Sequence, residues 1–119
     1  MPHVFLEYTP NLTEFDVDKA LLRINHALVA SGQFGAEFDI KSRAMELGAF
    51  RVGTALGERG FVHVKLALLS GRSAQIKKQL SESLLAGLKD LGDWPEGIEV
   101  QLSVEVVDLD RESYAKVAI

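Results

Sequence analysis

The chain has 119 residues, of which 47% are hydrophobic and 25% are charged, proportions typical of one globular domain. It contains no cysteine, which excludes disulfide bonds, thiolate metal sites and a cysteine nucleophile. The net charge of −4 disfavours a nucleic-acid partner, because such a partner needs a basic surface. The most apolar stretch, residues 61–69, is too short to span a bilayer, and no signal-peptide pattern opens the chain. We therefore expect a cytoplasmic protein with no membrane partner.

The first half of the chain predicts a strand, a helix and a second strand. Residues 2–8 alternate between apolar and polar side chains, as in a half-buried strand. Asp16 is a candidate N-cap for a helix that runs to about Ser31. A second strand is expected within residues 40–50, and the glycine-rich stretch 53–60 predicts a loose hairpin after it.

The second half repeats this order. Residues 61–69 are the clearest strand, and leucines and isoleucine recur at helical spacing between residues 76 and 91. Residues 93–97 are expected to form a loop, and residues 98–109 alternate as a predicted final strand. Residues 110–119 show no clear pattern.

A shift of 60 residues aligns the two halves. Over residues 3–32 it produces five identical pairs, which are His3 with His63, Val4 with Val64, Leu6 with Leu66, Leu28 with Leu88, and Gly32 with Gly92. We therefore predict a single α+β domain over residues 1–119, with a pseudo-repeat of residues 2–60 and 61–119. Two βαβ units would form one four-stranded sheet, and right-handed crossovers would put both helices on the same face.

The other face of that sheet would be left without a cover. It would carry apolar side chains mixed with charged ones, namely Phe5, Leu69, Met45 and Leu47 with Lys65 and Glu7. Such a face is too apolar to remain entirely in water, so we expect a closed homo-oligomer.

Three basic residues are candidates for binding a small anion. Lys41 and Arg43 are two positions apart in a predicted strand and project from the same face. Arg72 precedes the second helix, where free backbone N–H groups also favour an anion. Together they would suit a small di- or tricarboxylate. The alternative is that all three are solvated surface charges.

The histidines indicate no metal site. His3 and His63 occupy equivalent positions in the repeat, which would bring them near each other on the helix-free face. No third ligand with metal spacing accompanies them. His26 falls on a helix and is expected at the surface. We expect structural roles for all three.

Pro2 is the remaining candidate for chemistry. Removal of Met1 would leave a secondary amine at the head of the first strand. Burial and neighbouring cations would lower the pKa of that amine and make it a base near neutral pH. Proton abstraction beside a carbonyl requires such a base.

Several short segments carry a family resemblance, and they occur in order along most of the chain. They are MPHV at 1–4 leading into Glu7, SGQF at 31–34, IKSR at 40–43, FVHV at 61–64, GRS at 71–73 and VE at 104–105. Together they resemble the 5-carboxymethyl-2-hydroxymuconate isomerase family of the tautomerase superfamily.

The resemblance implies a homotrimer of two-βαβ subunits and a cofactor-free keto–enol tautomerase, an isomerase of the intramolecular oxidoreductase type. It implies that the Pro2 amine is the general base and that the substrate is an unsaturated oxo-tricarboxylate from aromatic catabolism. Arg72, with Lys41 or Arg43, would hold substrate carboxylates and stabilise enolate charge.

The chain also departs from the family pattern. Lys41 stands where the resemblance leads us to expect arginine, which removes a bidentate contact. The C-terminal segment is shorter than expected. Two alternatives therefore stay open: a tautomerase-superfamily hydratase or dehalogenase with another substrate, and a non-catalytic trimeric protein that binds small acids with Pro2 blocked.

Overall fold

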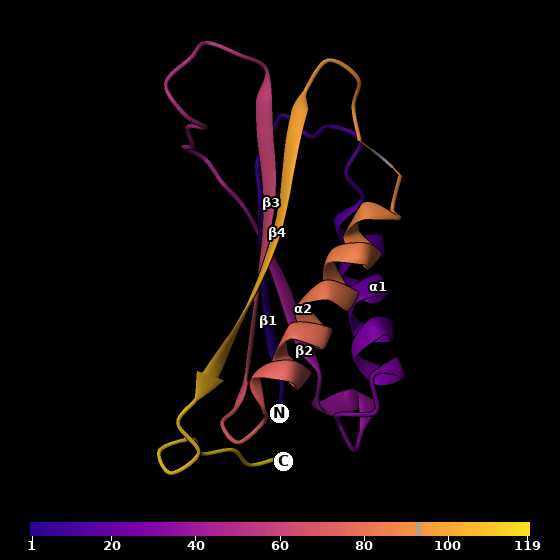
Figure 1. Ribbon diagram of the computed structural model, residues 1–119, viewed down its shortest axis with the longest axis vertical. Helices are drawn as coiled ribbons and strands as arrows, with labels where there is room; N and C mark the ends of the chain where they lie inside the picture. Colours follow the sequence, from indigo (N-terminus) through magenta and orange to yellow (C-terminus); the bar gives the residue numbers. More distant parts are fainter. Residues whose placement is uncertain (93) are drawn as a thin grey trace.

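The computed structural model describes residues 1–92 and 94–119. Its elements are β1 (His3–Tyr8), α1 (Val17–Ala30), a 3-10 turn η1 (Glu37–Asp39), β2 (Lys41–Glu46), β3 (Arg59–Leu69), α2 (Ala74–Lys89) and β4 (Glu99–Leu109). Figure 1 shows one sheet layer with both helices on the same side of it. The predicted fold class, two βαβ units with both helices on one face, is confirmed. Among the described residues, no helix is long and apolar enough to cross a membrane.

The sheet has the strand order β2-β1-β3-β4. β1 runs parallel to β2 and antiparallel to β3, and β4 runs parallel to β3. The loose hairpin predicted for residues 53–60 is wrong, because β2 and β3 are separated by β1. Each helical crossover places its second strand on the outer edge, so the link over residues 47–58 must span the width of β1. Figure 1 shows this link as an open loop beside the first residues of β3.

The register between β1 and β3 has a twofold centre at the pair Phe5–Lys65. His3 lies opposite Ala67, and Glu7 lies opposite His63. Residues 3 and 63 are equivalent in the repeat, and so are residues 7 and 67. The pair 3–67 is therefore the repeat equivalent of the pair 7–63. The two equivalent histidines are therefore four residues apart along the ladder, or about 13 Å. The expectation that they lie near each other is wrong for this reason.

Both helices begin as the sequence indicates. The Asp16 side chain caps α1 by accepting a hydrogen bond from the backbone N–H of Lys19 at 3.1 Å. Ser73 caps α2 in the same way with the N–H of Ile76 at 3.2 Å. α2 ends at Lys89, before the last leucine of its predicted stripe.

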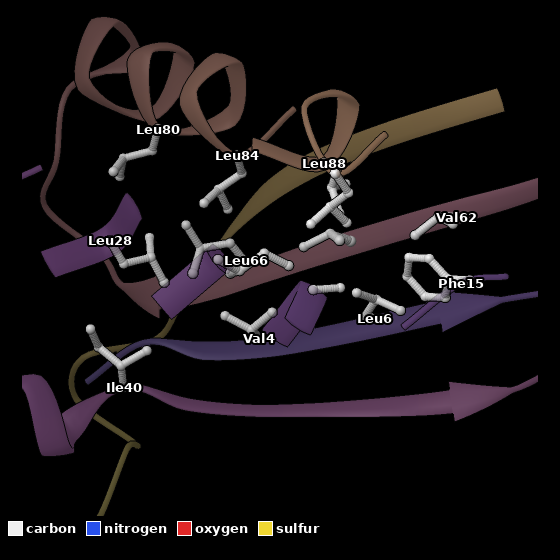
Figure 2. Packing of buried hydrophobic residues seen from close by; sticks show 14 of the residues in the cluster. Val4, Leu6, Phe15, Leu28, Ile40, Val62, Leu66, Leu80, Leu84 and Leu88 are labelled. Atoms are coloured by element: carbon white, nitrogen blue, oxygen red, sulfur yellow. The ribbon is translucent and has the colours of Figure 1, made fainter. Parts of the chain in front are cut away.

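Equivalent side chains from the two halves meet in one core (Figure 2). Leu28 of α1 and Leu88 of α2 are at most 1% exposed, and they pack over strand residues such as Val4, Leu6 and Leu66. Burying a side chain of this size contributes about 1.5–3 kcal/mol to the free energy of unfolding. The 60-residue repeat in the sequence is thus a repeat of core positions.

The C-terminal segment, residues 110–119, contains no regular element but has a defined path. It turns back after β4, so that the two chain ends lie near each other at one end of the sheet (Figure 1). The Arg111 guanidinium donates two hydrogen bonds to the carbonyl of Ser70, at 2.8 and 3.1 Å. The Tyr114 hydroxyl lies 2.9 Å from Nε2 of His3. These contacts join the C-terminal segment to the end of β3 and to the start of β1.

Candidate functional site

Pro2 lies buried at the head of the central strand β1, with less than 2% of its surface exposed. Its carbonyl accepts a hydrogen bond from the backbone N–H of Lys41 at 3.1 Å. Proline fits the first position of a strand, since no ladder hydrogen bond from its nitrogen is needed there. The sheet therefore fixes the nitrogen of residue 2 in the fold.

The surroundings of the chain terminus are rich in cations. Burial, first of all, lowers the pKa of the Met1 amine below its usual value. The charges acting on this amine are, in decreasing order, Asp39, which raises the pKa, and Arg72, Lys41 and Lys116, which lower it. These charges come from η1, the turn before α2, β2 and the C-terminal segment. An amine at this end of β1 is thus partly desolvated and surrounded by more positive than negative charge.

Arg72 is held in place by the loop that follows α1. Its Nη2 donates to the carbonyl of Gln33 at 2.8 Å, and its Nε donates to the side-chain oxygen of Gln33 at 3.3 Å. Nη1 lies 3.4 Å from the carbonyl of Leu69, and the guanidinium carbon lies 4.9 Å above the ring of Phe34. A guanidinium has more N–H donors than these contacts use, so Arg72 is positioned and can still bind an anion.

Lys41 and Arg43 are directed to different partners. Nζ of Lys41 donates to the carbonyl of Asp39 at 2.8 Å and belongs to the charges around the chain terminus. Nη2 of Arg43 lies 3.2 Å from Nδ1 of His3, and its guanidinium stacks 4.4 Å above the ring of Phe5. The structure thus groups Lys41 with Pro2 and Arg72, whereas Arg43 lies farther along the helix-free face that the two residues share, beside Phe5.

His3 connects this helix-free face with the C-terminal segment. Burial and the nearby charge of Arg43 lower the pKa of His3. A guanidinium can only donate, so Nδ1 of the neutral ring accepts from Arg43 and Nε2–H donates to the Tyr114 hydroxyl. This assignment gives His3 a structural role that depends on its being neutral.

Sequence reasoning missed several residues of this site. Asp39 precedes β2 without a recognisable motif, Gln33 lies in a loop, and Lys116 lies in the patternless C-terminal segment. Only the segment SGQF carried any signal for one of them, through the family resemblance. The others are brought in by tertiary contacts between residues far apart in the chain.

The helix-free face is hollowed beside Phe5. A groove of about 260 Å³ there is lined by seven residues, which are Phe5, Leu6, Glu7, Arg43, Ala44, Met45 and Lys65. Phe5 is 37% exposed and Met45 is 64% exposed. Within residues 1–92 and 94–119, no group of three or more His, Cys, Asp or Glu side chains could hold a metal ion.

The fold and the N-terminal arrangement define a tautomerase-like protein: a four-stranded mixed sheet, two helices on one face, and a buried proline at residue 2. The family model for 5-carboxymethyl-2-hydroxymuconate isomerase matches residues 2–119, and the chain belongs to this family. It is therefore a member of an isomerase family. A search of curated proteins found no match.

Solved structures agree with this assignment. A 5-carboxymethyl-2-hydroxymuconate isomerase from Deinococcus radiodurans is 28% identical with a TM-score of 0.87, covering 98% of this chain and 88% of that one. A 5-carboxymethyl-2-hydroxymuconate delta-isomerase is 17% identical with a TM-score of 0.72, covering 99% and 89%. A malonate semialdehyde decarboxylase is 12% identical with a TM-score of 0.65, covering 94% and 86%. The last two show a shared fold.

Proposed function

We propose that the protein is a keto–enol isomerase that moves a proton within an unsaturated oxo- or hydroxy-carboxylic acid. The proposed substrate is 5-carboxymethyl-2-hydroxymuconate or a related dienol. The proposed base is the Pro2 amine, which becomes free when Met1 is removed. The observation that carries this proposal is the burial of Pro2 at a chain terminus where burial, and then neighbouring cations, lower the pKa of the Met1 amine.

In the proposed reaction, Pro2 nitrogen takes the proton from the enol hydroxyl of the dienol. The electron pair of the O–H bond forms the new carbonyl, and the conjugated double bonds shift toward the distant carbon. The same nitrogen then returns the proton to that carbon. Atoms and electrons balance within substrate and amine, so the proposal requires no oxidant, reductant or cofactor.

Arg72 and Lys41 would bind the substrate carboxylates beside this nitrogen. They come from different elements, so they can hold a substrate at separate points and align it with the base. Their charge would also stabilise the enolate oxygen. Arg43 is the remaining candidate; its contact with His3 supports a role in shaping the neighbouring wall, with direct substrate binding as the alternative.

The chemical state of residue 2 tests the proposal. An N-terminally extended form keeps Pro2 nitrogen in an amide, whose lone pair is delocalised and cannot take a proton. Mature protein, verified by intact mass, should turn over a dienol from a panel of dienols and α-keto acids. The extended form should be inactive while showing the same thermal unfolding. Equal activity in the two forms would refute Pro2 as the base.

A second candidate is a tautomerase-superfamily enzyme with another substrate, acting by hydration or dehalogenation. The observation that favours it is the fold shared with a member of the cis-3-chloroacrylic acid dehalogenase family, with a TM-score of 0.64 at 16% identity. Turnover of haloacrylates but not of dienols would favour this candidate. A mature protein that binds small acids and turns over none would instead be a binding protein.

We also propose that the protein assembles as a homotrimer through the helix-free face. Phe5 and Met45 are exposed there between charged residues, and a partner subunit would remove them from water. Sedimentation at micromolar concentration should give the mass of a trimer. A stable monomer would overturn this assembly.

A further inference from the structure

The C-terminal segment places a lysine at the N-terminal site. Nζ of Lys116 donates to Oδ1 of Asp39 at 2.6 Å and lies 3.2 Å from the sulfur of Met1. The Lys116 and Asp39 side chains are 27% and 25% exposed, so this ion pair is largely covered. Lys116 is 115 positions from Met1 in the sequence, and the anchors Arg111 and Tyr114 hold the segment that brings it there.

We propose that Lys116 is a specificity-determining residue of the N-terminal site, where its ammonium group binds a carboxylate of the substrate. The inference rests on the proposed function and names a residue that neither the family resemblance nor the motifs supplied. It assigns a binding role to a segment that carries no sequence pattern.

The charges of the site give Lys116 this role. Asp39 is the acidic group among the charges that act on the chain-terminal amine, and alone it would repel an anionic substrate. Lys116 neutralises Asp39 by a short charge-assisted hydrogen bond. Removal of Met1 removes the sulfur that Nζ contacts, which leaves N–H donors of the ammonium directed toward the space beside residue 2.

The groups around that space come from every neighbouring element. They are His3 on β1, Asp39 on η1, Lys41 on β2, Arg72 before α2, and Lys116. Lys41 and Arg72 are each held by hydrogen bonds to backbone carbonyls. Lys116 is held by the Asp39 carboxylate through one N–H, and its remaining N–H donors can bind a substrate carboxylate while this pair stays intact. This difference makes Lys116 the cation most able to adapt to the position of a second or third carboxylate.

The experiment compares the mature forms of Lys116→Gln and of the control Lys77→Gln. Lys77 is matched in exposure, at 28%, and in partner, since it pairs with Asp108 at 3.4 Å. For a dienol with a distal carboxylate, Lys116→Gln should raise KM about tenfold. KM for a dienol lacking that carboxylate should change less than twofold. Lys77→Gln should match the parent with both substrates.

A second readout follows the amine itself. Lys116→Gln removes a positive charge that disfavours the protonated amine, so it should raise the pKa of the Pro2 amine. Asp39→Asn removes a negative charge that favours the protonated amine, so it should lower this pKa. The ¹⁵N shift of Pro2, titrated with pH, measures both directions. Thermal unfolding shows that each variant is folded. Unchanged KM values together with an unchanged Pro2 titration in Lys116→Gln would overturn the inference.

Binding of glutarate separates this inference from the proposed function. If the mature parent turns over no dienol, the proposed function fails. The role of Lys116 is then tested by glutarate binding, measured from the change in the ¹⁵N shift of Pro2. Binding about tenfold weaker in Lys116→Gln than in Lys77→Gln supports the inference. Equal binding in the two variants, or no binding to the parent, overturns it.

Discussion

The two ends of the sheet are related by the pseudo-twofold axis, yet they are built differently. At one end, the turn after β1 closes over the start of β3. The N–H of Thr9 donates to the Phe61 carbonyl, the N–H of Phe61 donates to Oγ1 of Thr9, and Nδ2 of Asn11 donates to the Arg59 carbonyl. At the other end, the chain terminus at Pro2 faces charged side chains. One end is sealed by hydrogen bonds, and the other is the candidate site.

Equivalent residues explain the difference. Pro2 corresponds to Val62 under the 60-residue shift, and both are buried. The nitrogen of Val62 lies within the chain and is an amide, whereas the nitrogen of residue 2 can become an amine. Arg72 corresponds to Leu12, which is buried in the core at 3% exposure. The repeat therefore duplicates the core, while the proposed amine chemistry requires the nitrogen at residue 2.

The largest effect is expected at the residue that distinguishes the ends. In mature protein, Pro2→Ala should lower kcat/KM about a hundredfold, because a more mobile primary amine is aligned less accurately with the substrate. The acidic limb of the rate profile should move between the two forms. The control Val62→Ala should instead lower the free energy of unfolding by about 2 kcal/mol and keep the rate profile. Equal activity of Pro2→Ala and the parent would contradict a special role for the end of the sheet that carries residue 2.

Arg72→Ala should lower kcat/KM about tenfold or more, since it removes a charge-assisted contact of about 1.5–3 kcal/mol. Its contacts with Gln33 predict some loss of stability as well, so assays belong well below the unfolding temperature. Arg23→Ala, which removes an exposed partner of Asp90, is the matched control and should keep parental activity. Parental activity in Arg72→Ala would make Arg72 a structural residue at the start of α2.

The sealed end should be sensitive to volume. A Cβ at Gly60 would lie 2.7 Å from Oγ1 of Thr9 and 2.9 Å from Oδ1 of Asn11. Gly60→Ala should therefore lower the free energy of unfolding by about 1–3 kcal/mol in urea. Gly87→Ala in α2, where the nearest atom is a flexible Arg23 carbon at 3.6 Å, should raise it by about 0.5–1 kcal/mol. Effects of the same sign would contradict the close packing at Gly60.

The smallest expected effect is a pH dependence at the open end. The folded state lowers the pKa of His3, so the unfolded chain binds its proton more readily. The contribution of the neutral His3 to the free energy of unfolding is therefore complete above about pH 6.5, and it declines as pH falls through the folded-state pKa. His3→Gln should reduce the loss of stability between about pH 6.5 and 5, measured by urea unfolding, whereas His26→Gln should retain it. Identical curves would exclude this role of His3.

The sequence determined the two crossovers, the common side of the helices and the core face of each strand. Period-two and helical patterns report burial directly, because each core side chain must face the same layer. These local patterns did not predict the order of the strands in the sheet. Residues 53–60 were predicted as a hairpin because glycines permit tight turns. Only the pairing of β1 with both β2 and β3 showed that the link between β2 and β3 crosses a strand.

The sequence also pointed to Pro2, Lys41 and Arg72, which the fold brings to one end of the sheet. It did not reveal that Arg43 turns to His3, or that Asp39 and Lys116 join this end. Local patterns record which face a residue takes and carry no trace of a partner 77 positions away. The tertiary structure decided these contacts, because antiparallel pairing of β1 and β3 brings the chain start, the turn before α2 and the C-terminal segment together.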